Sequence, residues 1–345
     1  MKRDLKRMPA EKVRLQNLMI KKMKTKVLER KMLKVFICIL FINVATAQKT
    51  DNSVIKHPNA LNFIVMGDWG RFGEDHQIPV AKQMGITATT INRDFIISTG
   101  DNFYPVGVAS EYDPQWKSSY EDIYTDFSLH WNWYPVLGNH DYAGNPDAQV
   151  AYSKISRRWN MPARYYSKTF NINGDANQQV LIAFIDTNAL IPEFYKNDVY
   201  GKNVVSQDST AQKKWLAKTL STAPKSVKWK LVVGHHPLFT ATLKRRESYD
   251  TKAVRKSLKS LLDKYEVDAY IAGHDHDLQH LKPEGKTNYF VSGSASESTA
   301  IDTLPFSKLA SSEYGFMVFS VLADVLYVQA VNEKGEVIYS TEIKK

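Results

Sequence analysis

The chain has 345 residues, of which 43% are hydrophobic and 12% aromatic; this supplies a substantial core and excludes an intrinsically disordered protein. Its formal net charge is +10, but residues 1–47 contain 13 Lys and Arg against 3 Asp and Glu, which leaves 33 of each sign in residues 48–345. Because the body of the chain is formally neutral, we expect no nucleic-acid partner.

The first feature along the chain is the basic leader, which ends in an apolar run at 35–42 and an Ala-Thr-Ala sequence at 45–47. The run is too short to span a bilayer, so residues 1–47 are predicted to be a leader with a secretory signal peptide. The protein would then be secreted or periplasmic, with no stable membrane insertion after cleavage. The alternatives are an uncleaved anchor and a true start at Met23 or Met32.

Apolar runs and amphipathic stretches alternate after a linker at 48–60, which predicts a single α/β domain at 61–345. We expect two packed mixed β-sheets flanked by α-helices. The predicted strands are 61–66, 95–99, 134–137, 229–233, 267–272, 288–292, 315–322, 325–331 and 337–341. The predicted helices are 77–92, 148–159, 209–220 and 251–265.

Five of these strands end at a glycine that is followed by side chains able to bind metal. Ligands in α/β proteins sit at the carboxyl ends of strands, so these side chains should converge. They offer nitrogen and oxygen without sulfur, which suits iron, zinc or manganese better than a structural zinc site. With Tyr104 the set is large enough for two ions that share a carboxylate. The alternative is that each residue only caps its strand. The set is Asp68, Asp101, Asn139, His140, His235, His236, His274 and His276.

The five motifs, in this order, resemble those of the metallophosphoesterases, the calcineurin-like superfamily. Within it the chain is similar to the purple acid phosphatases, especially the small tartrate-resistant (type 5) acid phosphatases. The resemblance covers about 61–345 and includes AYSKISRRWNMP at 151–162 and HDLQHL at 276–281. The motifs are GDWG at 67–70, GDNFY at 100–104, GNHDY at 138–142, VVGHHP at 232–237 and GHDH at 273–276.

This resemblance implies an acid phosphatase that hydrolyses phosphate monoesters with hydroxide activated by a dinuclear Fe(III)–M(II) centre, where M is iron, zinc or manganese. Its substrates would be small phosphate monoesters or phosphoproteins. By resemblance, His140 would bind phosphate and protonate the leaving group. Fe(III) would be held by Asp68, Asp101, Tyr104 and His276. The divalent ion would be held by Asp101, Asn139, His235 and His274.

The chain departs from the animal enzymes near the expected substrate. Lys244, followed by Arg245, stands where those enzymes have a histidine, and Tyr142 replaces another. We expect His236, Lys244 and Arg245 to contact the substrate. Two alternatives stay open: a phosphodiesterase or nucleotide hydrolase on the same scaffold, and a non-catalytic envelope protein that binds metal or phosphate.

Overall fold

The structure is a computed structural model that describes residues 14, 15, 17–26 and 53–345. It divides into two units, Met1–Asp51 and Asn52–Lys345. In the first unit, residues 17–26 are helical and exposed. The predicted signal-peptide run at 35–42 and cleavage site at 45–47 lie outside the described residues. Within the described part of the chain, no helix is long and apolar enough to cross a membrane.

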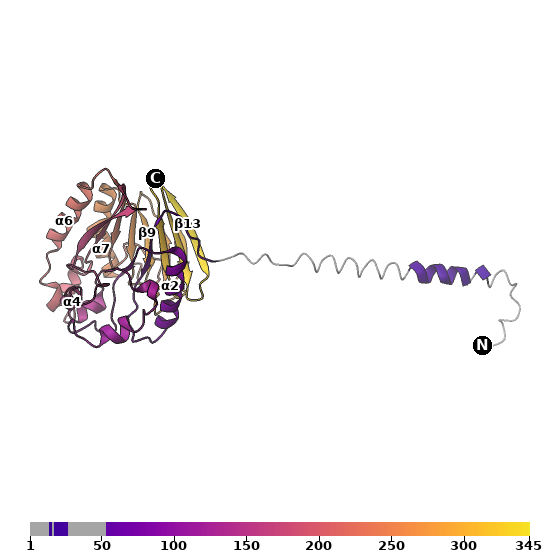
Figure 1. Cartoon of the computed structure of the whole chain (residues 1–345), viewed down its shortest axis with the longest axis horizontal. Helices are drawn as coiled ribbons and strands as arrows, with labels where there is room; N and C mark the ends of the chain where they lie inside the picture. Colours follow the sequence, from indigo (N-terminus) through magenta and orange to yellow (C-terminus); the bar gives the residue numbers. More distant parts are fainter. Residues whose placement is uncertain (1–13, 16, 27–52) are drawn as a thin grey trace. The chain divides into compact units, whose positions relative to one another are not determined.

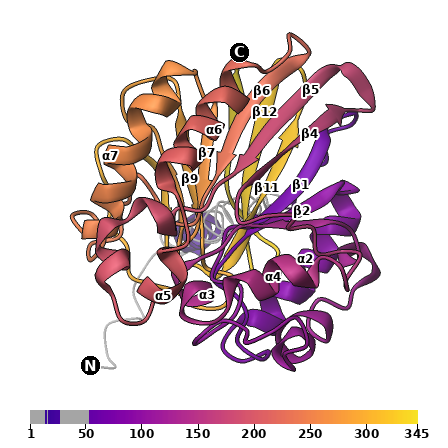
Figure 2. The same cartoon turned by 90° about the vertical axis from the view of Figure 1, so that its left-hand side faces the viewer.

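Two mixed β-sheets form the second unit (Figures 1 and 2). Each contains parallel and antiparallel pairs. The six-stranded sheet has the order β13 (Val337–Lys344), β12 (Val325–Asn332), β11 (Gly315–Val321), β1 (Leu61–Met66), β2 (Phe95–Ser98), β3 (Trp133–Pro135). The seven-stranded sheet has the order β10 (Ser307–Ser311), β8 (Leu278–Leu281), β9 (Asn288–Ser292), β7 (Ala269–Ala272), β6 (Val227–Val233), β5 (Asp175–Phe184), β4 (Tyr166–Ile172).

Helices flank the two sheets, with α6 and α7 beside the seven-stranded sheet and α2 near β1 and β2 (Figure 2). Helix α7 buries Val254, Leu258 and Leu262, one residue every fourth position, which is the spacing of a helix with one apolar face. The predicted class, two mixed β-sheets flanked by α-helices, is confirmed. The helices are α2 (Gln77–Ile91), α3 (Asn139–Ala143), α4 (Pro146–Tyr152), α5 (Gly201–Val204), α6 (Ser209–Ser221) and α7 (Tyr249–Lys264).

The core lies between the two sheets, and aromatic rings join them. Phe63 on β1 stacks on Phe95 of β2 and on Phe319 of β11 at 4.8 and 5.2 Å between ring centroids. Phe290 on β9 of the other sheet meets Phe319 edge-on at 5.3 Å. Every residue of β1 and β11 is buried, which explains why these strands read as continuous apolar runs rather than as alternating patterns.

The helix predicted at 148–159 is wrong in its extent, because α4 spans only Pro146–Tyr152. The chain leaves the helix at Ser153, whose hydroxyl accepts a hydrogen bond from the Met161 backbone at 2.8 Å and donates one to its carbonyl at 3.0 Å. The bend lets Arg158 reach Glu121 at 2.6 Å. Contacts distant in sequence therefore override the local helical pattern.

Replacement of Phe63 by Ala should lower the free energy of unfolding of the metal-free protein by about 3–5 kcal/mol, because it empties a fully buried aromatic site between β2 and β11. Phe127→Ala is the matched control: that ring is 78% exposed, so the change should stay within about 0.5 kcal/mol. Urea titration followed by circular dichroism measures both, and equal losses would contradict this account of the core.

Candidate metal centre

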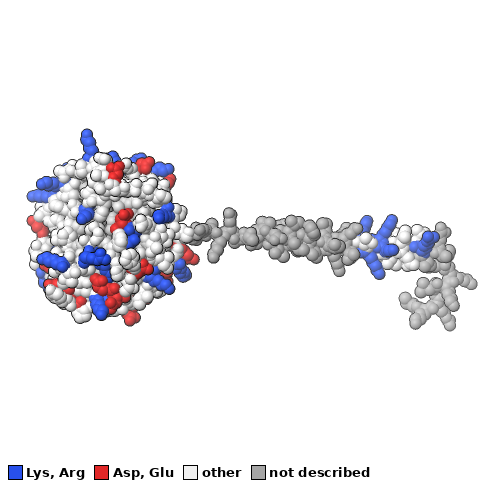
Figure 3. Space-filling view, viewed as in Figure 1, with Lys and Arg blue, Asp and Glu red and all other residues white. Residues whose placement is uncertain are grey.

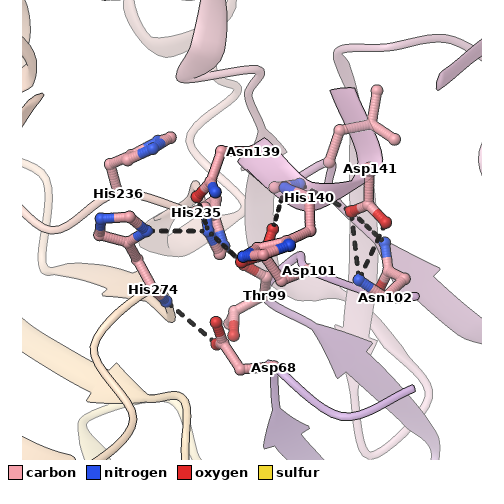
Figure 4. Close-up of polar contacts among 12 residues, drawn as sticks. Asp68, Thr99, Asp101, Asn102, Asn139, His140, Asp141, His235, His236 and His274 are labelled. Atoms are coloured by element: carbon pink, nitrogen blue, oxygen red, sulfur yellow. Dashed lines mark hydrogen bonds and ion pairs between the residues drawn. The ribbon is translucent and has the colours of Figure 1, made fainter. Parts of the chain in front are cut away.

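The predicted ligands follow five strands directly, on loops or, for Asn139, at the first residue of α3, and these segments meet at one end of the two sheets. Asp68 follows β1, and Asp101 and Tyr104 follow β2. The others come after β3, β6 and β7. Figure 4 shows Asp68, Asp101, Asn139, His235 and His274 side by side, with carboxylates, imidazoles and the amide turned toward one another. Both sheets therefore contribute to the site, each through the carboxyl ends of its strands.

The glycines before the ligands are required by the close approach of these loops. A Cβ on Gly138 would lie 2.0 Å from Asp101 Oδ1, and one on Gly273 would lie 2.5 Å from Asp68 Oδ2. No real Cβ contact is that short, so any larger residue would displace a carboxylate. The recurrent glycine in the motifs thus has a steric cause.

The first cluster surrounds the Tyr104 hydroxyl. That oxygen lies 3.1 Å from Asp68 Oδ1, 3.1 Å from Asp101 Oδ2 and 3.2 Å from His276 Nε2. The second oxygen of each carboxylate is fixed by a backbone N–H: the amide of His274 donates to Asp68 at 3.0 Å and that of His140 to Asp101 at 2.8 Å. Each carboxylate is thereby oriented with its other oxygen facing the cluster.

The second cluster surrounds His235 Nε2. This atom lies 3.2 Å from Asn139 Oδ1, 3.2 Å from His274 Nδ1 and 3.3 Å from Asp101 Oδ2. His235 Nδ1 is 2.8 Å from the Thr99 carbonyl and donates a hydrogen bond to it. In the neutral ring, Nε2 then carries a lone pair and no proton. Likewise, His274 Nε2 lies 2.9 Å from Asp250 Oδ2 and donates to it, so that Nδ1 carries the lone pair.

If both imidazoles are neutral, the lone pairs of His235 Nε2 and His274 Nδ1 face each other. They also face the acceptor oxygens of Asn139 and Asp101, and none of these four atoms carries a proton. A cation satisfies such a set, and carboxylate, amide and imidazole are ligands that transition metals accept. The donor atoms of Asp68, Asp101 and His235 all lie within 4.8 Å of one another, as do those of His235, His236 and His274. The residues present therefore fit a metal site on each side of Asp101.

Charges within the clusters alter several pKa values. Burial disfavours protonation of His235, but the neighbouring Asp101 outweighs it and raises the pKa of His235 to about 9. His276 is partly buried, which also disfavours its protonation, yet Asp68 and Glu297 raise its pKa to about 10. Burial and the two carboxylates raise the pKa of Tyr104 well above its usual value. In the absence of metal ions, His235, His276 and Tyr104 therefore keep their protons and donate hydrogen bonds to the carboxylates. A metal ion that binds here has to displace those protons.

His140 lies at the edge of the first cluster and is partly exposed. Its ring centroid is 4.4 Å from that of Tyr104, and its Nδ1 lies 2.7 Å from the Pro105 carbonyl. Because a carbonyl only accepts, Nδ1 carries the proton and Nε2 is the nitrogen left to exchange one with a ligand. The structure thus places His140 beside the centre rather than among the atoms that surround it.

The three residues predicted to contact the substrate are placed differently. The His236 ring is 4.4 Å from that of His274, and its buried Nε2 has no hydrogen-bond partner among the residues that the structure describes. Arg245 lies 3.5 Å from Asp250 and 3.7 Å from Asp275, so its charge already faces carboxylates. Lys244 is exposed. Only His236 adjoins the metal-binding atoms directly.

Two carboxylates that were not predicted from the sequence bind the outer nitrogens of the predicted ligands. Asp250 accepts from His274, and Glu297 Oε2 lies 2.9 Å from His276 Nδ1. Such partners fix the orientation of a metal-binding imidazole. A third, buried Asp141, accepts from the backbone N–H groups of Asn102 and Gly138 and so ties two ligand loops together. Asp141 stands inside the GNHDY motif and could have been identified, whereas no sequence pattern marks the other two.

Comparison with known proteins identifies the family. Residues 61–278 match the Calcineurin-like phosphoesterase family. Purple acid phosphatase 7 of Arabidopsis thaliana is 32% identical over 329 residues, covering 90% of this chain and 95% of that protein. Tartrate-resistant acid phosphatase type 5 of Homo sapiens is 38% identical over 243 residues, covering 68% and 72%.

Solved structures share the fold. GAP50, the anchor in the inner membrane complex of Plasmodium, is similar with a TM-score of 0.72 at 29% identity, covering 83% of this chain and 89% of that one. Purple acid phosphatase PPD1 from yellow lupin (Lupinus luteus) seeds has a TM-score of 0.61 at 16% identity, covering 85% and 55%, which speaks for the fold alone. The extent and identity of the two acid phosphatase matches confirm the predicted family. The chain belongs to the purple acid phosphatases, within the calcineurin-like phosphoesterases.

Proposed function

We propose that the protein hydrolyses phosphate monoesters at a dinuclear centre of Fe(III) and a divalent ion, which is iron, zinc or manganese. The observation that carries this proposal is the position of Asp101 Oδ2, which is 3.1 Å from the Tyr104 hydroxyl and 3.3 Å from His235 Nε2. One oxygen thus belongs to both clusters, as a bridging ligand requires.

The two clusters differ in the charge that they offer. Asp68, Asp101 and Tyr104 supply three anionic oxygens once the phenol ionises, and they suit a trivalent ion. Asn139 and two imidazoles are neutral, and with Asp101 they suit a divalent ion. When bound, such a pair of cations neutralises phosphate oxygens and acidifies water enough to supply hydroxide near neutral pH.

The chain's own side chains would orient the substrate and move the proton. His140, with Nε2 free to exchange a proton, would bind phosphate and protonate the leaving oxygen. The unpaired Nε2 of His236 would meet a further oxygen near the second cluster. Lys244 and Arg245 remain predicted phosphate contacts, and the Arg245 side chain, which lies near Asp250 and Asp275, is 40% exposed.

The substrates that we infer are small phosphate monoesters or phosphoproteins, and the protein would be secreted or periplasmic after removal of residues 1–47. Two observations argue against a nucleic-acid partner. Residues 48–345 carry equal numbers of acidic and basic side chains. On the face of the second unit drawn in Figure 3, the two signs are interspersed, which does not favour a nucleic-acid partner.

A comparison of substrates tests the reaction class. We expect the iron-loaded protein to hydrolyse an aryl phosphate monoester with a kcat/KM at least about 10-fold higher than that for the matching diester, since a monoester presents more anionic oxygens to the two cations. A nucleotide series run in parallel identifies a nucleotide hydrolase. A diester preference would replace the proposal by a phosphodiesterase, and metal binding without turnover would indicate a non-catalytic protein.

Replacement of Asp101 by Ala should remove both ions and nearly all activity, because one carboxylate serves both clusters. Metal content per chain, measured by mass spectrometry after dialysis, is the readout. Asp324→Ala, at an exposed position on the turn between β11 and β12, is the matched control and should keep two ions. Two retained ions in Asp101→Ala would show that another group bridges them.

A further inference from the structure

An ion pair between Arg71 and Glu297 covers the outer side of the first cluster. Arg71 Nη2 donates to Glu297 Oε2 at 2.7 Å, and its guanidinium carbon lies 3.8 Å from the centroid of the Tyr104 ring. The same Glu297 oxygen is 2.9 Å from His276 Nδ1. A single pair of charges therefore contacts both Tyr104 and His276, the two ligands of the first cluster that are not carboxylates.

Arg71 is anchored by several contacts, and its ion pair with Glu297 joins loops from the two sheets. Arg71 lies in the loop after β1, whereas Glu297 lies in the loop after β9 of the other sheet. Arg71 Nε donates to Ser296 Oγ at 3.1 Å, and that hydroxyl donates to the Asp68 carbonyl at 2.6 Å. The Arg71 side chain is 18% exposed and that of Glu297 is 43% exposed, and Arg71 Nε also lies 3.7 Å from Asp75 Oδ2. Its position is thus fixed relative to a ligand loop, unlike a mobile surface ion pair.

We propose that Arg71 and Glu297 are positioning residues that set, in opposite senses, how strongly Tyr104 and His276 donate electrons to the trivalent ion. This inference rests on the proposed function, because it presupposes Fe(III) at the first cluster. Arg71 and Glu297 would thereby set the reduction potential of the trivalent ion without binding it.

The opposite effects of Arg71 and Glu297 on the reduction potential follow from electrostatics. A guanidinium over an aromatic face attracts the ring's π electrons, so Arg71 weakens the phenolate as a donor and disfavours the ferric state. A carboxylate that accepts the Nδ1 hydrogen of an imidazole strengthens the other nitrogen as a donor, so Glu297 favours the ferric state. Because the two residues are themselves paired, each moderates the effect of the other.

Absorption spectra and reduction potentials of iron-loaded variants test the inference. Arg71→Gln should shift the phenolate-to-iron band to longer wavelength and lower the reduction potential. Glu297→Gln should raise the potential and weaken iron affinity about 10–100-fold. Arg71→Lys, which keeps the charge, should lie between wild type and Arg71→Gln. Arg93→Gln is the matched control, since that guanidinium lies 4.1 Å from the Trp131 ring in a different part of the fold, and it should match wild type.

Two further variants assign the visible band and test whether the two charges act in opposite directions. Tyr104→Phe should lose the visible band, which assigns that band to this phenolate. The double variant Arg71→Gln/Glu297→Gln removes both charges and should return the potential toward wild type, so it tests the inference even where a single variant folds poorly. A wild-type protein without iron or a visible band would overturn the proposed function and this inference together. A wild-type band with potentials that stay unchanged, or that shift in the same direction in both single variants, would overturn the inference alone.

Discussion

The buried carboxylate of Asp101 is the constraint on which the site and its loops depend. A fully buried anion is costly unless positive charge or hydrogen bonds compensate it. Its two oxygens have different partners, since Oδ1 accepts the backbone N–H of His140 while Oδ2 faces Tyr104 and His235. The charge on the nearby histidines holds the pKa of Asp101 well below its usual range despite its burial. The carboxylate is therefore an anion placed between two sets of potential metal ligands, where it would serve a cation bound on either side.

Loops from both sheets are tied together around this carboxylate. The outer nitrogen of each metal-facing imidazole has a fixed partner: the Thr99 carbonyl for His235, Asp250 for His274 and Glu297 for His276. These partners come from the loop after β2, from α7 and from the loop after β9, so parts of the fold far from the metal atoms determine imidazole orientation. A bound metal would consequently stabilise the packing of the two sheets, because the ligands exist as a set only in the folded chain.

The sequence predicted the parts of the fold that have a local cause. The strand ends were identifiable because continuous apolar runs stop at glycines, and Gly138 and Gly273 are fixed there by close contacts. The hairpin of β4 and β5 was missed although Asn173-Gly174, with φ of 49° and 76°, is a strong turn signal. Its strands alternate exposed and buried residues only in part, so no clear period marked them.

The predicted metal ligands lie together, and their roles remain a prediction. Asp250, Glu297 and Arg71 could not be predicted because each acts through a neighbour that is distant in the chain. The substrate contacts predicted for Lys244 and Arg245 also remain predictions: the Lys244 side chain is exposed, and Arg245 lies near the carboxylates of Asp250 and Asp275. Motif spacing thus identifies atoms that bind directly, whereas tertiary contacts determine which residues orient them.

Anomalous X-ray diffraction from crystals of the iron-loaded protein tests the dinuclear site most directly. We expect two metal peaks flanking Asp101 Oδ2. One, an iron peak, should lie within bonding distance of Tyr104 and His276. The other should lie within bonding distance of His235 and His274. A single peak, or two peaks that do not share Asp101, would contradict it.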